Sequence, residues 1–448
     1  MSAVIASSRT PWFNPDTGVL DRRIFSDHDI YKQELERIFA RAWNFICHES
    51  QLPESGSFFM SYIGEDQVIA VRDRTGKINV LLNSCSHRGN SVCRAEQGRT
   101  NSFVCSYHGW NYDLDGRLIA MPNQDTFYRN DIDKTKWGLG KAAQVASYRG
   151  FVFATLDSTA PPLEDYLGWV GRLGLDFFAS QGELEVMDGI HKNRLQCNWK
   201  LAVDNLYDWY HVKVSHGSAM RIGFIGEEGM SPMSQMVILG EYGHGIGGPG
   251  VTTAQLDELA ARMQRGGGTE EEKQWYDIFA MRRLDPRMRK ELGPVGSRAL
   301  GHPNIFPNLW VALTNQVCLR IPRGPFETEL WWFTLIPKGL PEAARRETIY
   351  MANHVFGPAG LLEQDDGENW SHSTRGAKGT VTKRLPLNYQ MGRGHDRVTH
   401  DPSGQSAIET VVNEHGQRWT YQAWQEWMQS ESWQELIANH SMPPAEVV

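Results

Sequence analysis

Two short cysteine–histidine pairs constrain the fold of this chain more than any other feature. Cys85-Ser-His87 and Cys105-Ser-Tyr-His108 supply two thiols and two imidazoles, with seventeen residues between the pairs. Four ligands from two loops can meet only when a rigid scaffold holds both loops side by side. A glycine follows each pair, at Gly89 and Gly109, where a tight turn needs a backbone without a side chain. The pattern therefore predicts a metal centre on two adjacent loops of a small β domain.

Two kinds of metal centre use two cysteines and two histidines. In a Rieske [2Fe–2S] cluster, two thiolates hold one iron and two imidazoles hold the other, which gives a mid-range one-electron carrier. A structural zinc site takes the same residue types, but it usually pairs like with like along the chain. Here each loop supplies one cysteine and one histidine, so we interpret the four residues as Rieske ligands. A zinc site is the alternative.

The pattern of predicted strands and helices divides the chain into domains. Short strand candidates separated by turn signals predict an antiparallel β domain over residues 43–157, and Ala160-Pro-Pro marks its end. Residues 158–448 mix helices with long strands and predict an α+β domain, on which a helical segment, residues 1–42, packs. The expected β-domain strands are residues 58–63, 68–72, 78–83, 102–105 and 148–156. The expected helices of the second domain are residues 163–180, 198–211, 269–284, 359–373 and 421–439, and its sheet strands are 308–317, 317–322, 328–337 and 348–355.

Composition excludes several classes of partner. The net charge is −8, and no basic stripe with interleaved aromatic residues predicts nucleic-acid binding. The longest apolar runs are too short to span a bilayer, and the first ten residues lack the apolar core of a secretory signal. The four remaining cysteines have no framework spacing, which favours reduced thiols in a cytoplasmic protein: Cys47, Cys93, Cys197 and Cys318.

A second candidate metal site follows the domain boundary. His211 and His216 are five residues apart, and on a helix such residues diverge by ~140°. Both imidazoles can therefore bind one metal only if the helix ends or bulges between them. A third, oxygen ligand would complete a 2-His-1-carboxylate site with open positions for O2. Further along, consecutive Asp365 and Asp366 would repel each other unless solvent or a cation separates them. We expect solvation for Asp365 and coordination for Asp366; ordinary polar histidines are the alternative.

In this order, the motifs closely resemble those of the large (α) subunit of Rieske non-haem iron aromatic-ring-hydroxylating dioxygenases, such as the benzoate, biphenyl and naphthalene enzymes. The resemblance covers nearly the whole chain. It implies an α+β fold, with an N-terminal antiparallel β Rieske [2Fe–2S] domain and a helix-grip (START-like) catalytic domain that has a long antiparallel sheet. It also implies the ligands: Cys85, His87, Cys105 and His108 for the [2Fe–2S] cluster, and His211, His216 and Asp366 for mononuclear Fe(II).

The resemblance implies a role for Asp208 as well. It matches the family's bridging carboxylate, which joins a cluster histidine of one subunit (His108 here) to an iron histidine (His211) of its neighbour. Independently, a residue three before His211 can share a helical face with it. A carboxylate on the second ring nitrogen fixes the tautomer of a ligand histidine and raises its basicity. Because the two sites fall in different domains, the resemblance implies that the family's head-to-tail trimer, which closes into a ring, supplies the pairing.

The substrate signals conflict. The family usually has Glu-Asn where this chain has Asp204-Asn205, and the spacing from Asn205 to Asp208 resembles benzoate- and terephthalate-type enzymes. Residues 363–370 look more like the biphenyl and toluene branch. Phe356, ten residues before Asp366, matches a pocket-lining aromatic position, with a core phenylalanine as the alternative, and Asn205 is a second pocket candidate. An aromatic acid would need a buried arginine; the candidates are Arg221, Arg320 and Arg323, and we expect each of them at the surface.

The activity that the resemblance implies is that of a terminal oxygenase. It adds both atoms of O2 to an aromatic ring and gives a cis-dihydrodiol, with electrons from NAD(P)H through a reductase and ferredoxin. A small β subunit is expected in an α3β3 assembly. The alternatives are a Rieske monooxygenase or O-demethylase, an electron carrier without a second iron, and a zinc-dependent hydrolase.

Overall fold

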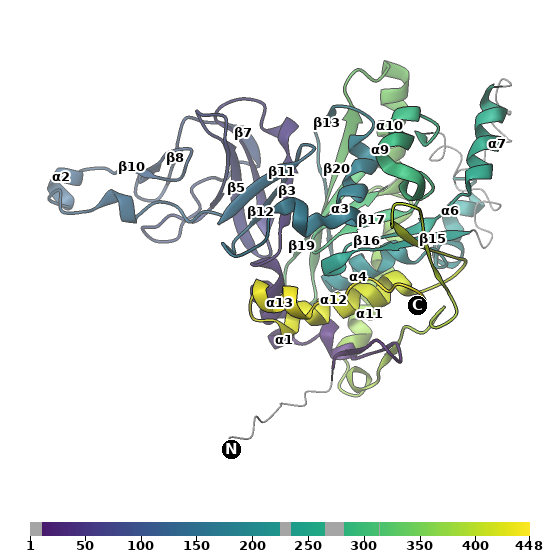
Figure 1. Cartoon of the computed structure of the whole chain (residues 1–448). Helices are drawn as coiled ribbons and strands as arrows, with labels where there is room; N and C mark the ends of the chain where they lie inside the picture. Colours follow the sequence, from purple (N-terminus) through teal and green to yellow (C-terminus); the bar gives the residue numbers. More distant parts are fainter. Residues whose placement is uncertain (1–10, 225–233, 265–281, 313) are drawn as a thin grey trace.

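The computed structural model describes residues 11–224, 234–264, 282–312 and 314–448. A narrow β arm extends from one side of a larger body in which helices cover a long sheet (Figure 1). The arm carries the cysteine–histidine pairs, and the body carries the histidine and aspartate motifs.

Three antiparallel sheets build the β arm. The expected strands at residues 58–63, 68–72 and 78–83 are confirmed. The expected strand at 148–156 is instead a hairpin, because Arg149 and Gly150, both with positive φ, form a turn inside it. The sheets contain β11 (Gln144–Tyr148), β12 (Phe151–Thr155) and β3 (Asn44–His48); then β6 (Ile78–Leu82), β5 (Asp66–Arg72), β4 (Ser57–Ile63) and β7 (Gln97–Arg99); and, at the tip, β10 (Leu118–Ala120), β9 (Asn111–Tyr112) and β8 (Phe103–Val104).

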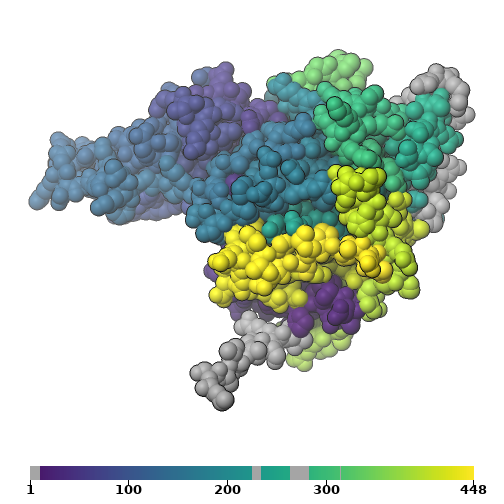
Figure 2. Space-filling view, in the orientation of Figure 1, coloured from purple at the N-terminus to yellow at the C-terminus, as the bar shows by residue number. Residues whose placement is uncertain are grey.

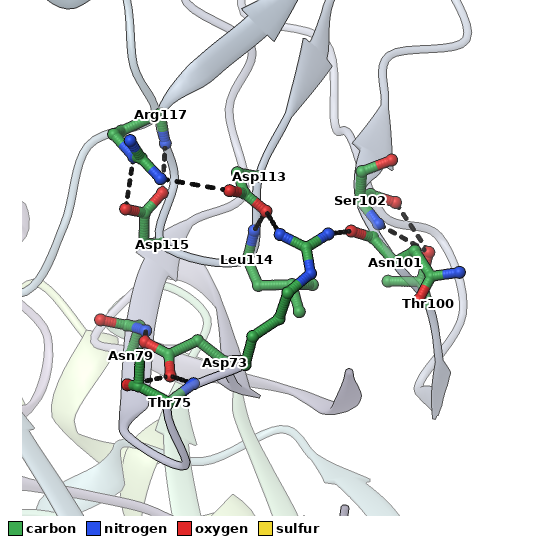
Figure 3. A network of polar contacts seen from close by, with 11 residues as sticks. Asp73, Thr75, Asn79, Thr100, Asn101, Ser102, Asp113, Leu114, Asp115 and Arg117 are labelled. Atoms are coloured by element: carbon green, nitrogen blue, oxygen red, sulfur yellow. Dashed lines mark hydrogen bonds and ion pairs between the residues drawn. The ribbon is translucent and has the colours of Figure 1, made fainter. Parts of the chain in front are cut away.

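Two turns of the arm are joined to each other. The Asp73 carboxylate caps its own turn, because it accepts hydrogen bonds from Thr75 and Asn79, as Figure 3 shows. Arg74 leaves this turn and donates to Asp113 Oδ1 at 2.8 Å, in the second turn. Arg117 donates to the other Asp113 oxygen at 3.3 Å. These contacts link the β5–β6 turn to the turn that follows β9, and so brace the tip of the arm.

The body contains a long antiparallel sheet, which confirms the α+β prediction. Among the described residues its strand order is β13-β20-β19-β18-β17-β16-β15-β23-β22, and β14 also pairs with β20. The strands are β13 (Leu184–Val186), β14 (His191–Leu195), β15 (Gln235–Leu239), β16 (Gly245–Pro249), β17 (His302–Ile305), β18 (Leu309–Ala312), β19 (Gln316–Pro322), β20 (Thr328–Pro337), β22 (Val398–His400) and β23 (Ser406–Thr410).

Opposite faces of this sheet have different partners. Pro303 and Ile305 contact α3 (Leu163–Ala179), where Gly174 leaves room for them. Tyr207, in the 3-10 turn η5 (Asn205–Tyr207), lies on Gly245 and Gly247, which pair with the intervening residues of β17. Because successive residues of a strand point to opposite faces, His302 and Asn304 face η5. Among the described residues, the helices that follow α3 are α4 (Trp199–Asp204), α5 (Val212–Ser215), α6 (Gly217–Arg221), α7 (Thr253–Gln264), α9 (Pro286–Gly296), α10 (Glu342–Val355), α11 (Glu363–Lys378), α12 (His415–Gln429) and α13 (Trp433–Asn439).

Several predicted elements are wrong in type or bounds. The expected strand at 348–355 is the end of α10, which begins after Pro341 and buries Ala352 and Val355 at helical spacing. The helix expected at 359–373 begins at Glu363, and the one at 421–439 is two helices, α12 and α13. The helix expected at 198–211 stops at Tyr207. Most of the helix expected at 269–284 lies outside the described residues.

The N-terminal segment packs on the body. Strands β1 (Phe13–Asn14) and β2 (Val19–Leu20) join β21 (Leu387–Asn388) in a small sheet. Helix α1 (His28–Glu34) ends in Glu34, which is fully buried and contacts Lys200 at 2.5 Å. Figure 2 shows part of this purple segment against the yellow C-terminal helices. No helix of the described residues is long and apolar enough to cross a membrane.

Candidate metal centres

Residues 85–90 and 105–110 form two turns of the same backbone design at the end of the β arm. In each, the cysteine N–H donates to the carbonyl five residues on, at 2.9 and 2.8 Å. The glycine four residues on donates back to the cysteine carbonyl, at 2.7 and 2.9 Å. Gly89 and Gly109 have φ of 73° and 71°, which explains why glycine stands at both positions. The two turns thus present their cysteines in the same way.

The side chains of these turns meet as a pair of thiols and a pair of imidazoles. Cys85 contacts the thiol of Cys105, and the rings of His87 and His108 lie 4.4 Å apart between centroids. Nδ1 of both histidines is buried and has no hydrogen-bond partner. Like ligands side by side, with imidazole nitrogens free to coordinate, fit a cluster in which one iron has two thiolates and the other has two imidazoles.

The surroundings of Cys105 favour its thiolate form. Asn90 Nδ2 lies 3.5 Å from Cys105 Sγ, and the Tyr112 hydroxyl lies 3.1 Å from Cys85 Sγ. Burial opposes ionisation of Cys105, but hydrogen bonds, that of Asn90 foremost, hold its pKa below the usual range. The thiolate is the form that binds metals. The other four cysteines are buried and form no disulfides: Cys47, Cys93, Cys197 and Cys318.

A second centre lies on the sheet face that η5 covers. Nε2 of His211 and Nε2 of His216 are 3.2 and 3.4 Å from Asp366 Oδ1, and 3.3 Å from each other. Bonds of ~2.1 Å to one common ion place neighbouring ligand atoms ~3.0–3.4 Å apart, so the triangle has the size that a metal ion requires. Among the described residues, these three form a group able to hold an ion. Two imidazoles and one carboxylate are the ligand set of non-haem Fe(II) sites.

The backbone breaks that the five-residue spacing requires are present. The helix from Trp199 ends before Asp208, whose φ and ψ are −87° and 84°. Helix α5 between the two histidines is a single turn, and His216 ends it with φ and ψ of −96° and 26°. The chain therefore changes direction on both sides of α5, and the two imidazoles converge instead of pointing apart.

A carboxylate contacts the second ring nitrogen of each of these histidines. Asp208 Oδ1 accepts the backbone N–H of His211 at 3.1 Å and lies 3.4 Å from its Nδ1. Asp208 reaches the ring from a turn, however, and not along a helical face. Asp365 Oδ2 lies 3.3 Å from Nδ1 of His216. The expectation that Asp365 is merely solvated therefore missed a partner of His216, which the need of a ligand imidazole for a second acceptor could have indicated.

The negative charge of this group favours a cation between its members. Burial alone would lower the pKa of His211, but hydrogen bonds to Asp208 and Asp366 outweigh it and raise that pKa to about 10. Asp366 is almost fully buried, and its Oδ1 faces Nε2 of both histidines. A buried carboxylate of this kind is stable only when paired with a positive charge.

An aromatic wall borders the second centre. Phe356 is buried and stacks on Trp332, with centroids 4.7 Å and planes 7° apart, and it lies 5.0 Å from Trp310. His302, 6.0 Å from Phe356, interacts electrostatically with both Asp366 and His211, which places the wall beside the metal group. Burial lowers the pKa of His302 to about 3, so its imidazole is neutral.

Sequence reasoning did not single out three members of this wall: His302, Trp310 and Trp332. These residues share a face of the sheet because of the register between its strands, which the sequence does not reveal. His302 is assigned to this face only because it pairs with Gly247, on which Tyr207 of η5 lies. Asn205, the other predicted pocket residue, is half-buried in η5, and no hydrogen bond joins its side chain to the metal group in the described part of the chain.

The arginine candidates for an acidic substrate have other partners or positions. Arg221 is exposed, and Arg323 pairs with Glu329 at 2.9 Å. Arg320 is only 1% exposed, so the expected surface placement is wrong for it. Its Nη2 donates to Asn304 and to the carbonyls of the turn between β17 and β18, which holds that turn.

Two family models match this chain. The model described as Rieske [2Fe-2S] domain matches residues 42–148. The model described as ring hydroxylating alpha subunit (catalytic domain) matches residues 181–430. Each model contains one of the two centres described above.

Similar proteins match over nearly the whole chain. The α subunit of biphenyl 2,3-dioxygenase from Rhodococcus jostii (strain RHA1) is 34% identical, over 97% of this chain and 96% of its own. The α subunit of benzene 1,2-dioxygenase from Pseudomonas putida is 33% identical, over 95% and 94%. The structure of a naphthalene 1,2-dioxygenase variant bound to phenanthrene superposes with a TM-score of 0.83, at 27% identity, over 95% of this chain and 96% of that one.

Proposed function

This chain belongs to the family of ring-hydroxylating α subunits, and we propose that it is the terminal oxygenase that adds both atoms of O2 to an aromatic hydrocarbon and gives a cis-dihydrodiol. One observation carries the proposal: the triangle of His211, His216 and Asp366 lies beside an aromatic wall. The family has a Rieske [2Fe–2S] cluster and a mononuclear iron. When bound, they supply one-electron transfer and O2 activation, respectively.

We assign the ligands as the geometry arranges them. The paired thiols and paired imidazoles would hold the cluster: Cys85, Cys105, His87 and His108. The triangle would hold the mononuclear iron through two Nε2 atoms and one carboxylate oxygen. Asp208 and Asp365 keep a proton on Nδ1 of His211 and His216, so that each Nε2 is free to coordinate.

The protein's own groups then orient the substrate and exclude water. Phe356, Trp310 and Trp332 offer flat apolar surfaces for a planar ring, and the neutral His302 adds no charge to the wall. The relatives named for biphenyl and benzene, together with the ion pair of Arg323 with Glu329, favour a neutral hydrocarbon over an aromatic acid.

A ring of three copies would connect the two centres. We infer that His108 of one copy meets Asp208 of the next, because Asp208 already contacts His211 and is only half-buried. Large apolar side chains exposed on the arm near the ligand turns support such a contact: Val104 (52%), Tyr107 (59%), Ile119 (40%), Phe127 (71%) and Trp137 (44%).

The remaining partners follow from the proposed reaction. A small β subunit in an α3β3 assembly fits the relatives, which are named as α subunits. A ferredoxin or an NAD(P)H-dependent reductase would supply electrons one at a time. We propose residues 1–42 as a segment of the catalytic body, 43–157 as the Rieske domain and 158–448 as the catalytic domain. Six unpaired cysteines are compatible with a reducing cytoplasm.

A single turnover under ¹⁸O2 tests this function. Chemically reduced holoenzyme would be mixed with biphenyl, benzene, naphthalene and benzoate, and the products read by mass spectrometry, with Asp366→Ala as the control. We expect a cis-dihydrodiol with two labelled oxygens from a hydrocarbon and none from the variant. One labelled oxygen would show a monooxygenase or O-demethylase instead. A brown, reducible protein that oxidises nothing, and whose redox behaviour is unchanged in the variant, would show an electron carrier.

A further inference from the structure

Glu363 has no part in the function proposed above, yet it lies in the middle of the site's supporting structure. It is the first residue of α11, one turn before Asp366, and its exposure is 0%. One carboxylate oxygen accepts the backbone N–H of Gly357. The indole N–H of Trp332 and the amide of Asn193 also face this carboxyl, without a well-aligned hydrogen bond. No cation pairs with it among the described residues.

An acidic group in such a place is expensive to bury. Burial is the main reason why the pKa of Glu363 is raised to about 7; the N–H groups of Trp332, Gly357 and Asn193 oppose this rise, and the charge of Asp366 adds to it. A leucine of similar volume would fill the same space without a desolvation penalty. The structure thus favours a role for Glu363 that depends on the hydrogen bonds its carboxylate oxygens accept, and not on packing alone.

The groups that Glu363 contacts belong to the aromatic wall. Trp332 lies directly under Phe356, in the stacked pair. Gly357 follows Phe356 in the chain, at φ 93°, and a side chain there would collide with His191. Removing the acceptor of the Gly357 N–H would therefore free the backbone on which Phe356 sits.

The link from the wall to the metal group is short and rigid. The loop between α10 and α11 folds back on itself, with Gly360 N–H donating to Gly357 at 2.9 Å and Leu361 N–H to His354 at 2.7 Å. Glu363 closes this loop from the α11 side. Asp366 follows three positions later in the same helix, a distance that the helix fixes at about one turn.

We propose that Glu363 is a positioning residue: it fixes the Phe356–Trp332 pair relative to Asp366 and so decides which ring carbons of the substrate face the metal. This inference rests on the proposed function, because it assigns Glu363 to the regiochemistry of that reaction. It gives a reason for a buried, unpaired carboxyl behind an apolar wall.

Three variants of the full-length holoenzyme test the proposal. Glu363→Ala removes the acceptor, Glu363→Gln keeps an oxygen for the Gly357 N–H, and Glu368→Ala removes an exposed glutamate from the same helix as a matched control. The regioisomer ratio from toluene and biphenyl, kcat, KM and iron content would be measured. Hydrogen–deuterium exchange of residues 356–362 measures how firmly Glu363 holds this loop, and it requires no turnover.

We expect Glu363→Ala to change the regioisomer ratio at least threefold and to raise KM about tenfold, with iron content unchanged. Exchange at residues 356–362 should rise about tenfold, as the loss of one buried hydrogen bond predicts. Glu363→Gln should stay within about twofold of the wild type in ratio and exchange, since it keeps the acceptor. Glu368→Ala should match the wild type throughout.

Unchanged regioisomers and exchange in Glu363→Ala would overturn the proposal, as would equal effects of Ala and Gln. If Glu363→Ala does not fold, Glu363→Leu fills the same space without an acceptor; it must then shift the ratio and raise the exchange, and an unchanged ratio and exchange overturn the proposal. Failure of the wild type to form a doubly labelled product would reject the proposed function, and with it the assigned regiochemistry, while the exchange measurement would still decide whether Glu363 anchors the loop.

Discussion

The buried ion pair between Glu34 and Lys200 gives a quantitative prediction about how the catalytic body is held together. Lys200 is 2% exposed and Glu34 is 0% exposed, and their charged atoms are 2.5 Å apart. Glu34 also accepts the indole N–H groups of Trp199 and Trp424, each at 2.8 Å. One carboxylate therefore joins α1, α4 and α12, and either single substitution leaves a buried charge without its partner.

The loss of stability can be estimated from the cost of leaving one buried charge without its partner. Breaking a buried pair by removing one partner costs about 3–5 kcal/mol, whereas replacing both partners by uncharged groups is often nearly neutral. At ~2.1 cal/mol/K per residue, unfolding of a chain of 448 residues has an entropy of ~0.9 kcal/mol/K. Glu34→Gln and Lys200→Met should each lower Tm by about 3–5 °C. The double variant should lose less than the larger single loss.

Thermal unfolding of the holoenzyme, followed by far-UV circular dichroism at pH 7, measures these shifts in the four proteins of a double-mutant cycle. An exposed pair, Lys338 and Glu183, provides the control, and its single variants should change Tm by less than about 1 °C. Additive losses in the double variant, or single losses as small as those of the exposed pair, would refute the reasoning.

Three further predictions concern the two centres and the pH dependence of stability. Asp366→Ala should lose the mononuclear iron and keep the visible absorption of the cluster, whereas Cys105→Ser should lose the cluster; metal analysis and absorption spectra separate the two. Asp365→Asn should weaken iron binding by about 10–100-fold, as measured by competition with a chelator, because it replaces the anionic acceptor on His216 by a neutral amide. Burial lowers the pKa of His244 to about 4, below its unfolded value of about 6.5, so its contribution to stability is present above pH 6.5 and about 3 kcal/mol is lost as the pH falls to 4. Urea unfolding between pH 7 and 4 should show a shallower acid loss in His244→Gln, and an unchanged loss would contradict the assignment.

The parts of this structure that sequence could predict are those with local causes. The two ligand turns depend on a cysteine and a glycine four residues apart, and alternation with turn residues marks strands such as β4 and β5. The break around α5 could be stated as a condition, because two imidazoles five residues apart on a helix cannot converge. Each of these follows from residues that are close in the chain.

The parts that could not be predicted depend on contacts between distant segments. Residues 348–355 contain β-branched and aromatic side chains, yet they form a helix, because α10 must bury Ala352 and Val355 against β20. His302 belongs to the wall only because β17 has a given register with β16. The burial of Arg320 depends equally on where the turn between β17 and β18 lies.

The contact between Glu34 and Trp424 also has a consequence in time. The two residues are 390 positions apart in the chain. At roughly 5–20 residues per second, a ribosome needs on the order of 20–80 s to reach Trp424 after it has made Glu34. During that interval the β arm can complete its local sheets. The carboxylate of Glu34 in α1 and the ammonium of Lys200 in α4 remain in water until Trp424 of α12 can pack against them. We therefore expect the arm to fold during synthesis and the catalytic body to close only after Trp424 has been made.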